Sequence, residues 1–172
     1  WGHLDEFAFE CDIISKMYSQ LTTAPPVPET NRMPFTPEQI AALWEIQDEP
    51  WVDTVLVFLY TGFRLMELLN MQTEQVDLQQ KTFQGGIKTA AGKGRIVPIH
   101  PKILPFVQAW AQHGHKYLIT ADGKKLSKQK YYECWAEVMD RIGADKTPHE
   151  ARHTFETSLD NAKANRKCID LL

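Results

Sequence analysis

The sequence predicts an α+β domain that is mainly α-helical and carries a small antiparallel β-sheet. Two capping-box patterns, Thr36-Pro37-Glu38-Gln39 and Thr147-Pro148-His149-Glu150, mark the starts of helices, because a Thr followed three residues later by Gln or Glu satisfies free backbone N–H groups. Apolar residues at helical spacing occupy most of the chain. Residues 81–99 change character, since two short β-prone segments there flank a turn rich in Gly, Ala and Lys.

The N-terminal part predicts one helix followed by a linker. Apolar residues recur at helical spacing over residues 4–21. Residues 22–30 contain three prolines, cannot continue a helix and predict an extended connection. We therefore expect residues 1–25 to end one domain, residues 26–35 to link, and residues 36–172 to form a second domain.

The second domain is predicted to begin with three helices. The first starts at the Thr36 capping box and extends to about Gln47. A strongly apolar segment, residues 51–60, predicts a buried helix that Gly62 ends. Residues 63–71 predict a third helix with leucines on its inner face.

A hairpin and three further helices are expected after these. The strand candidates are residues 81–85 and 95–99. Pro101 suits the first turn of a helix, Ser127 is a good N-cap, and Gly143 is a helix-ending residue. These helices are predicted over residues 101–114, over residues 128–142, and from the Thr147 capping box onward.

Composition indicates a folded, cytoplasmic protein. The 172 residues are 24% charged and include five Trp and eight Phe, which argues against disorder. The longest apolar run, Val55–Tyr60, is too short to span a bilayer, and Asp5 and Glu6 occupy the place of a signal peptide's basic flank. The three cysteines are widely spaced and include no CxxC, so we expect neither a disulfide framework nor a structural zinc site.

The charges are strongly segregated along the chain, although the net charge is only -3. Residues 1–80 contain 3 basic and 13 acidic side chains, whereas residues 81–130 contain 10 basic side chains and a single acidic one, Asp122. Local charge governs contacts with phosphates. The basic segment therefore favours an anionic polymer as partner over a merely solvated lysine-rich surface.

Two motifs contain groups suited to an oxyanion. With Thr147 as N-cap, His149 lies in the first turn and Arg152 one turn later, at a helix end that favours negative charge. In Thr61-Gly62-Phe63-Arg64-Leu65-Met66-Glu67-Leu68, Arg64 stands among apolar residues and needs a carboxylate, which Glu67 supplies. The alternatives are a surface histidine and purely structural ion pairs.

The turn between the two strands is a third feature that could serve chemistry. Its glycines and alanines allow close approach to a partner, and Lys88 could deliver a proton or a charge. The alternative is an exposed lysine that only aids solubility.

In this order, the three elements resemble the catalytic domain of tyrosine recombinases, the phage-type integrases. The likeness lies in a Thr-Gly-x-Arg-x-x-Glu-Leu box, a lysine in a β-hairpin that ends in a Val-Pro strand, and His-x-x-Arg-His. The linker and the start Phe35-Thr36-Pro37-Glu38-Gln39-Ile40 also resemble integrases of mobile elements. The resemblance implies the tyrosine-recombinase catalytic fold for residues 36–172 and the end of a core-binding domain for residues 1–25.

The resemblance also assigns roles to individual residues. Arg64 and Arg152 would bind the nonbridging oxygens of the scissile phosphate, and Glu67 would position Arg64. Two arginines stabilise the charge of a pentacoordinate phosphate without a metal or cofactor.

Proton transfer falls to other residues of the same motifs. Lys88 would protonate the leaving 5′ oxygen, with Lys93 as the alternative because hairpin length varies in the family. His149 would assist proton transfer at the nucleophile, and His153 would support it.

The implied reaction is site-specific strand exchange in double-stranded DNA through a 3′-phosphotyrosyl intermediate. The implied assembly is a homo-tetramer of the full-length enzyme on DNA, with accessory DNA-bending proteins, whereas this chain alone would be a monomer. The side chains expected to face DNA are Lys93, Arg95, Lys125, Lys128 and Lys130.

The nucleophile departs from the family pattern. Its tyrosine follows the His-x-x-Arg motif in the family, whereas all five tyrosines of this sequence precede His149. We therefore expect a fragment that ends before its nucleophile and is inactive alone.

Two other interpretations stay open. His149-Glu150-Ala151-Arg152-His153 matches the H-E-x-x-H signature of zinc peptidases, with Glu150 as the base. A catalytically silent DNA-binding relative would keep the fold without the chemistry.

Overall fold

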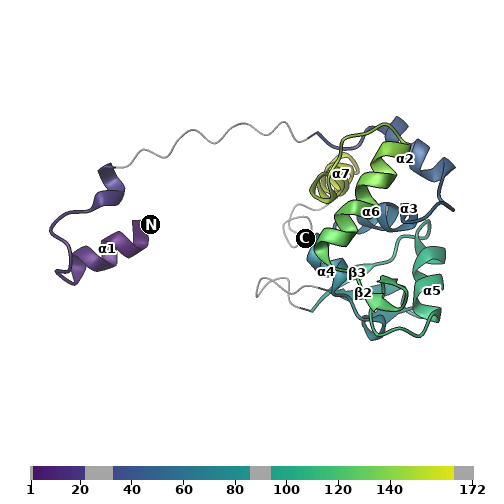
Figure 1. The fold of residues 1–172 in the computed structure, drawn as a ribbon, viewed down its shortest axis with the longest axis horizontal. Helices are drawn as coiled ribbons and strands as arrows, with labels where there is room; N and C mark the ends of the chain where they lie inside the picture. Colours follow the sequence, from purple (N-terminus) through teal and green to yellow (C-terminus); the bar gives the residue numbers. More distant parts are fainter. Residues whose placement is uncertain (1, 22–32, 86–93, 165–172) are drawn as a thin grey trace. The chain divides into compact units, whose positions relative to one another are not determined.

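A computed structural model describes residues 2–21, 33–85 and 94–164 of the chain (Figure 1). The chain divides into two compact units, residues 1–31 and residues 32–172, and each is described by itself. Within the described residues, no helix has the length and apolar character needed to cross a membrane.

The N-terminal unit contains two short helices instead of the predicted helix over residues 4–21, and that prediction is wrong. Helix α1 spans Gly2–Glu10, and the 3₁₀ helix η1 spans Tyr18–Leu21. The chain leaves α1 at Asp12, whose φ of 55° is left-handed, a conformation that Asp tolerates better than most residues. Apolar spacing does not reveal such a helix end.

The helices of the C-terminal unit follow the predicted order, and their bounds are α2 Pro37–Glu45, α3 Val52–Thr61, α4 Leu65–Leu69, η2 Thr73–Gln75, α5 Leu104–Gln112, α6 Lys128–Arg141 and α7 Pro148–Asn161. Local signals set several of their starts. The Thr36 hydroxyl accepts the Gln39 N–H at 3.3 Å, and the Ser127 hydroxyl accepts the Lys130 N–H at 3.1 Å. At α7, the Thr147 N–H donates to Glu150 Oε2 at 2.8 Å. Helix α4 begins two residues later than predicted because Arg64, its N-cap, has an extended ψ of 149°, and it ends two residues earlier, at Leu69.

The strands form two small antiparallel sheets, so the predicted α+β class is confirmed. In the first sheet, β1 (Val76–Asp77), β2 (Thr82–Gly85) and β3 (Arg95–Pro98) lie in this order, with Phe83 opposite Val97. The second sheet, β4 (Thr120–Ala121) with β5 (Lys124–Lys125), was not predicted. Its turn, Asp122-Gly123, has both φ angles positive, and Asp-Gly at such a two-residue turn is a hairpin signal.

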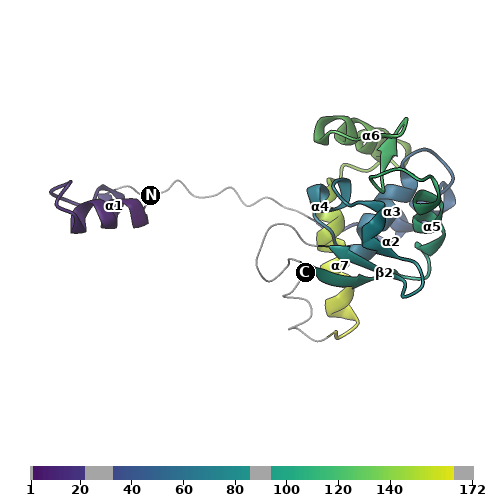
Figure 2. The ribbon, with the colours of Figure 1, turned by 90° about the horizontal axis from the view of Figure 1, so that it is seen from below.

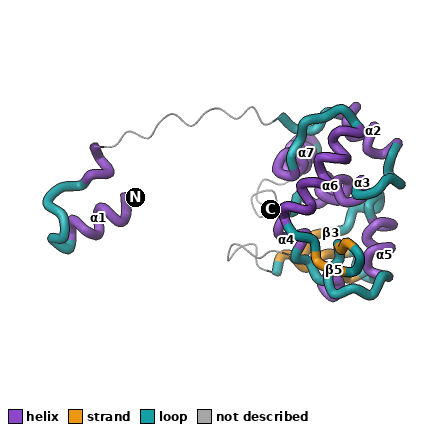
Figure 3. Tube along the Cα trace, viewed as in Figure 1, coloured by secondary structure: helices purple, strands orange, loops and turns teal. Residues whose placement is uncertain are grey.

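Helix α3 forms the centre of the C-terminal unit. It packs along α7 and α2, and most of its side chains are buried. A view turned by 90° shows α3 between α6 and β2 (Figure 2). The strands gather at one end of the unit, and α2, α3, α6 and α7 lie toward the other (Figure 3). This packing brings the start of α7 toward the end of α3, where Gly62 and Arg64 lie.

The carboxyl of Asp53, in the first turn of α3, should make the unfolding free energy depend on pH. Its Oδ2 accepts the Trp110 indole N–H at 2.8 Å, and burial raises the pKa of its carboxyl. A raised pKa means that the folded state binds a proton more tightly than the unfolded state, so this contribution to stability is present below the ordinary pKa of about 3.9. It is lost as pH rises through the folded-state pKa.

We therefore expect the unfolding free energy of Asp53→Asn to be lower than that of the wild type at about pH 4. The difference should shrink as pH rises to about 7, because the wild type loses the contribution of Asp53. Urea unfolding of both proteins across that range measures the difference. Asp140→Asn, on an exposed part of α6, is the control and should show no such trend. A difference for Asp53→Asn that does not change with pH would contradict the prediction.

Candidate active site

The starts of α4, α6 and α7 meet around one cavity of about 380 Å³. Its wall combines basic, histidine and aromatic side chains with an apolar floor. The lining residues are Phe63, Arg64, Leu65, Met66, Glu67, Asn70, Lys128, Tyr132, Pro148, His149 and Arg152. Five of the predicted site residues line this cavity: Arg64, Glu67, His149 and Arg152 from two motifs far apart in sequence, and Lys128 from the predicted DNA-facing set.

Arg64 is held by Glu67 and still reaches solvent. Arg64 Nη1 lies 3.3 Å from Glu67 Oε1, and the Arg64 backbone N–H donates to Glu67 Oε2 at 3.0 Å. The Glu67 side chain is 5% exposed, whereas that of Arg64 is 43% exposed. The predicted pair therefore exists, with the carboxylate buried and the guanidinium open to the cavity.

Arg152 enters the cavity from the second turn of α7. Its Nη1 donates to the Gly62 carbonyl oxygen, and its Nε lies 3.1 Å from Glu156 Oε1. Burial lowers the pKa of Arg152, while Glu156 acts in the opposite direction and nearby Arg64 lowers it further. Arg152 is thus fixed at two points beside a second guanidinium, an arrangement that favours an anion between them.

Arg95 lies inside the protein, although the sequence suggested a DNA-facing side chain. Arg95 Nη2 lies 3.1 Å from Glu67 Oε2, and its side chain is 9% exposed. The guanidinium also covers the Phe63 ring at 5.3 Å from the centroid. Burial lowers the pKa of Arg95, and Glu67 raises it. Sequence gave no sign of this contact, because β3 and α4 meet only through the fold.

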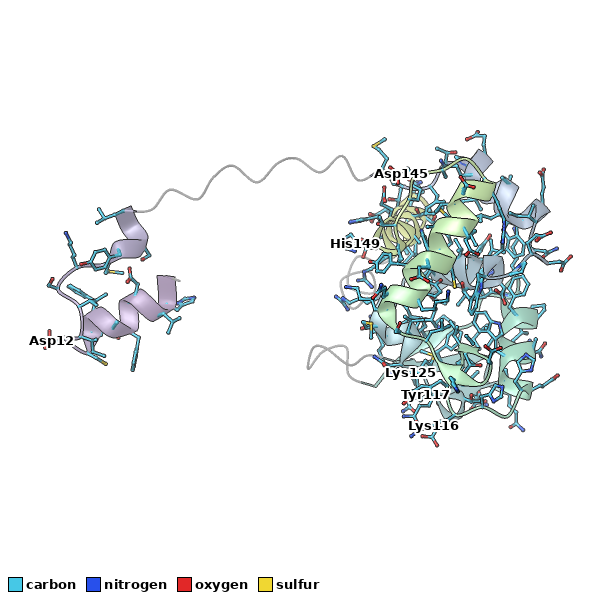
Figure 4. The ribbon with its side chains drawn as sticks, viewed as in Figure 1. Asp12, Lys116, Tyr117, Lys125, Asp145 and His149 are labelled. Carbon is cyan, nitrogen blue, oxygen red and sulfur yellow. The ribbon has the colours of Figure 1, made fainter. Side chains whose placement is uncertain are left out.

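The two histidines of the last motif are neighbours. The rings of His149 and His153 are 4.6 Å apart in an edge-to-face arrangement, and His153 Nδ1 lies 3.4 Å from Glu156 Oε2. His149, in the first turn of α7, is exposed (Figure 4). Its ring is accessible to a ligand in the cavity that it lines.

Glu150 does not take the position that a zinc peptidase requires. Its side chain is buried, Oε2 accepts the Thr147 N–H, and Oε1 lies 3.7 Å from Lys146 Nζ. The carboxylate therefore caps α7. Among the described residues, no three His, Cys, Asp or Glu side chains are grouped to hold a metal ion.

The predicted lysines differ in their surroundings. Lys88 and Lys93 lie outside the described residues. Lys128, predicted to face DNA, lines the cavity together with Arg64, His149 and Arg152. Lys130 Nζ pairs with Glu133 at 2.9 Å, which neutralises part of its charge.

A basic and aromatic cluster, Lys116-Tyr117-Lys125, lies at one end of the C-terminal unit (Figure 4). Lys125 Nζ is 5.0 Å and Lys116 Nζ is 5.8 Å from the centroid of the Tyr117 ring. Lys125 was predicted to face DNA, and Lys116 approaches the same Tyr117 ring.

Comparison with known proteins gives one consistent result. The model of the phage integrase family matches residues 35–172. The tyrosine recombinase XerC of Proteus mirabilis is 31% identical over 134 residues, which are 69% of this chain and 42% of XerC. The tyrosine recombinase XerA of Pyrococcus furiosus is 27% identical over 147 residues, 78% of this chain and 50% of XerA. The chain spans about half the length of these curated relatives.

Solved structures share the fold. The Tn1549 transposon integrase in complex with circular intermediate DNA matches with a TM-score of 0.76 at 21% identity, over 99% of this chain and 66% of that chain. A lambda integrase tetramer bound to a Holliday junction matches with a TM-score of 0.73 at 15% identity, over 99% and 55% of the two chains. These likenesses confirm the predicted fold.

Proposed function

Because the chain belongs to the phage integrase family, whose model covers residues 35–172, we propose that it is the catalytic part of a site-specific DNA recombinase. One observation carries the proposal. Arg64 and Arg152, from two helices, line one cavity beside His149. The cavity is suited to a phosphate, since preorganised cations stabilise the charge that develops during phosphoryl transfer.

The proposed roles follow from these positions. Arg64 and Arg152 bind the nonbridging oxygens of the scissile phosphate, and Glu67 orients Arg64. His149 assists proton transfer at the attacking oxygen, with His153 in ring contact behind it. Lys88 or Lys93 protonates the leaving 5′ oxygen. The products are a 3′-phosphotyrosyl link and a free 5′ hydroxyl, and reversal on a second strand rejoins the DNA.

Double-stranded DNA in the cytoplasm is the proposed substrate. The Tn1549 integrase and lambda integrase structures contain DNA, and the latter is a tetramer on a Holliday junction, which supports a tetramer for the whole protein. Accessory DNA-bending proteins are proposed as further partners on the family resemblance alone. Residues 1–25 are proposed to end a core-binding domain. The N-terminal unit exposes several large apolar side chains, among them Leu4, Phe7 and Ile13. Such exposure is typical of a surface that packs against further residues, which supports the proposal.

The test is covalent trapping of DNA by the product of the full coding frame. A duplex that carries the recombination site and a nick beside the cleavage position loses its short 5′-hydroxyl strand after attack, so the protein–DNA adduct accumulates. An adduct that maps to a tyrosine after the His-x-x-Arg motif supports the proposal. A protein that binds the site but gives no adduct would instead favour the silent DNA-binding relative.

Lys125→Ala is expected to weaken DNA binding by about two- to fivefold and to reduce the slope of log K against log salt by about 1, because one phosphate contact is lost. Fluorescence anisotropy of a labelled duplex at several salt concentrations measures both quantities. Lys102→Ala is the control, since Lys102 lies over Trp44 and outside the Lys116-Tyr117-Lys125 cluster. Equal slopes for the wild type and Lys125→Ala would remove Lys125 from the DNA interface.

A further inference from the structure

Glu67 is shared by two arginines and one backbone N–H. Its Oε2 accepts the Arg64 backbone N–H at 3.0 Å and the Arg95 Nη2–H at 3.1 Å, whereas its Oε1 faces Arg64 Nη1 at 3.3 Å. Oε2 of the carboxylate thus contacts both the backbone at the start of α4 and the Arg95 side chain. The Arg64 side chain receives only the other oxygen, through one long contact.

Because the two Glu67 oxygens have different partners, Arg64 is only partly neutralised by this carboxylate. An Arg and a Glu three residues apart at a helix start can form a two-bond pair, the strongest form of this ion pair. Such a pair would turn the Arg64 fork toward Glu67, so that fewer of its N–H groups would face an anion in the cavity. With Oε2 occupied by Arg95, the observed contact is single, and the Arg64 side chain stays 43% exposed.

The place of Arg95 suits this task. It comes from β3, lies behind Glu67, and does not line the cavity that holds Arg64 and Arg152. The Phe63 ring under its guanidinium and the Glu67 carboxylate at its end fix it in one position. A lysine has no planar fork to stack on Phe63 and reach Glu67 together.

We propose that Arg95 is a positioning residue that keeps Arg64 available to the phosphate by occupying Oε2 of Glu67. The inference rests on the proposed phosphate site, yet it concerns a residue that the phosphate does not touch. Removal of Arg95 takes one of two donors from Oε2, which keeps the Arg64 backbone N–H and can then also accept the Arg64 guanidinium, so the anion loses one of its two arginines. Arg95 therefore acts through Glu67 and not through its own charge in the cavity.

The test uses the whole 172-residue chain and inorganic phosphate as the probe. Titrations followed by the NMR signals of the Arg64 and Arg152 Nε–H groups report the affinity and the state of each guanidinium. Arg95→Gln is expected to weaken phosphate binding by about fivefold or more, a loss near 1 kcal/mol. It should also shift the Arg64 signal in the absence of phosphate, because the contact with Glu67 changes.

A second substitution separates this mechanism from a loss of packing or of charge. Adding Glu67→Gln to Arg95→Gln should raise the affinity at least about twofold above that of Arg95→Gln alone, since a neutral amide cannot capture Arg64. The recovery stays below the wild-type affinity because Glu67 also orients Arg64. Adding Glu156→Gln instead is the matched control. It removes the same charge from the carboxylate that pairs with Arg152 and should not restore binding.

The outcomes are distinct. Rescue by Glu67→Gln alone supports the proposal, whereas equal rescue by both substitutions would mean that only net charge matters and would overturn it. Unchanged affinity in Arg95→Gln would also overturn it and would leave the proposed recombinase function intact. A wild-type chain that does not bind phosphate would refute the anion site itself.

Arg95→Lys keeps the positive charge and carries the test if Arg95→Gln does not fold. An intermediate loss of phosphate affinity, about two- to threefold, is expected together with a shifted Arg64 signal. Wild-type affinity with an unshifted Arg64 signal would overturn the proposal.

Discussion

Replacement of Arg152 by lysine is expected to lower the rate of DNA cleavage by about 10²-fold or more, because one preorganised donor to a transition-state oxyanion contributes that much. The lysine keeps the charge. It loses the planar fork that donates to the Gly62 carbonyl oxygen through Nη1 and holds Glu156 through Nε. The charge therefore remains near the cavity without a fixed position.

Affinity for DNA is expected to change by less than about threefold in the same variant, since many phosphate contacts share the binding energy. Single-turnover covalent trapping with the full-length protein gives the rate, and anisotropy gives the affinity. Arg141→Lys is the matched control, because Arg141 donates to the Pro50 carbonyl oxygen and does not line the cavity. Cleavage by Arg152→Lys at the wild-type rate would exclude Arg152 from the chemistry.

Gly62→Ala is expected to lower the unfolding free energy more than the other substitutions considered for stability, Asp53→Asn and Gly143→Ala. Gly62 ends α3 with a left-handed φ of 61°, and a Cβ there would lie 2.4 Å from Phe155 Cδ1 of α7. The left-handed backbone costs about 1 kcal/mol for alanine, and the clash adds about 1–3 kcal/mol because the ring must move within a packed interface. We expect an unfolding free energy lower by about 3 kcal/mol.

Gly143→Ala separates the two causes. Gly143 also has a left-handed φ of 60°, but nothing lies within 4 Å of the position of its Cβ. We expect this variant to lose only about 1 kcal/mol. Urea unfolding followed by circular dichroism compares the two, and equal losses would show that Phe155 moves aside without cost. The Gly62 carbonyl oxygen accepts a bond from Arg152, and a backbone shift that relieves the clash with Phe155 would move this oxygen. Gly62→Ala should therefore weaken phosphate binding as well, whereas Gly143→Ala should not.

Local signals made much of the fold predictable. The Thr36 capping box and the Ser127 N-cap depend on residues within three positions, and the structure confirms both. The left-handed end of α1 at Asp12 was missed, because an apolar pattern describes a helix face and not its end. The β4–β5 hairpin was missed although its Asp122-Gly123 turn was visible in the sequence.

In the candidate site, too, contacts between residues close in sequence were predictable and contacts between distant residues were not. The Arg64–Glu67 pair spans three positions at a helix start, so the order of residues predicts it, although the buried partner is Glu67 and not Arg64. The contact of Arg152 with Gly62 spans 90 positions, and that of Arg95 with Glu67 spans 28. Both depend on how α7 and β3 pack, which residue patterns do not specify.

The distance in sequence between Gly62 and Arg152 also sets an order of events during synthesis. The ribosome releases α3 and α4 long before α7, so Arg64 and its carboxylate are made while the second arginine is still absent. The pair of guanidiniums forms only when α7 packs along α3. During synthesis, the proposed phosphate site therefore holds one of its two guanidiniums until α7 has been made and has packed along α3.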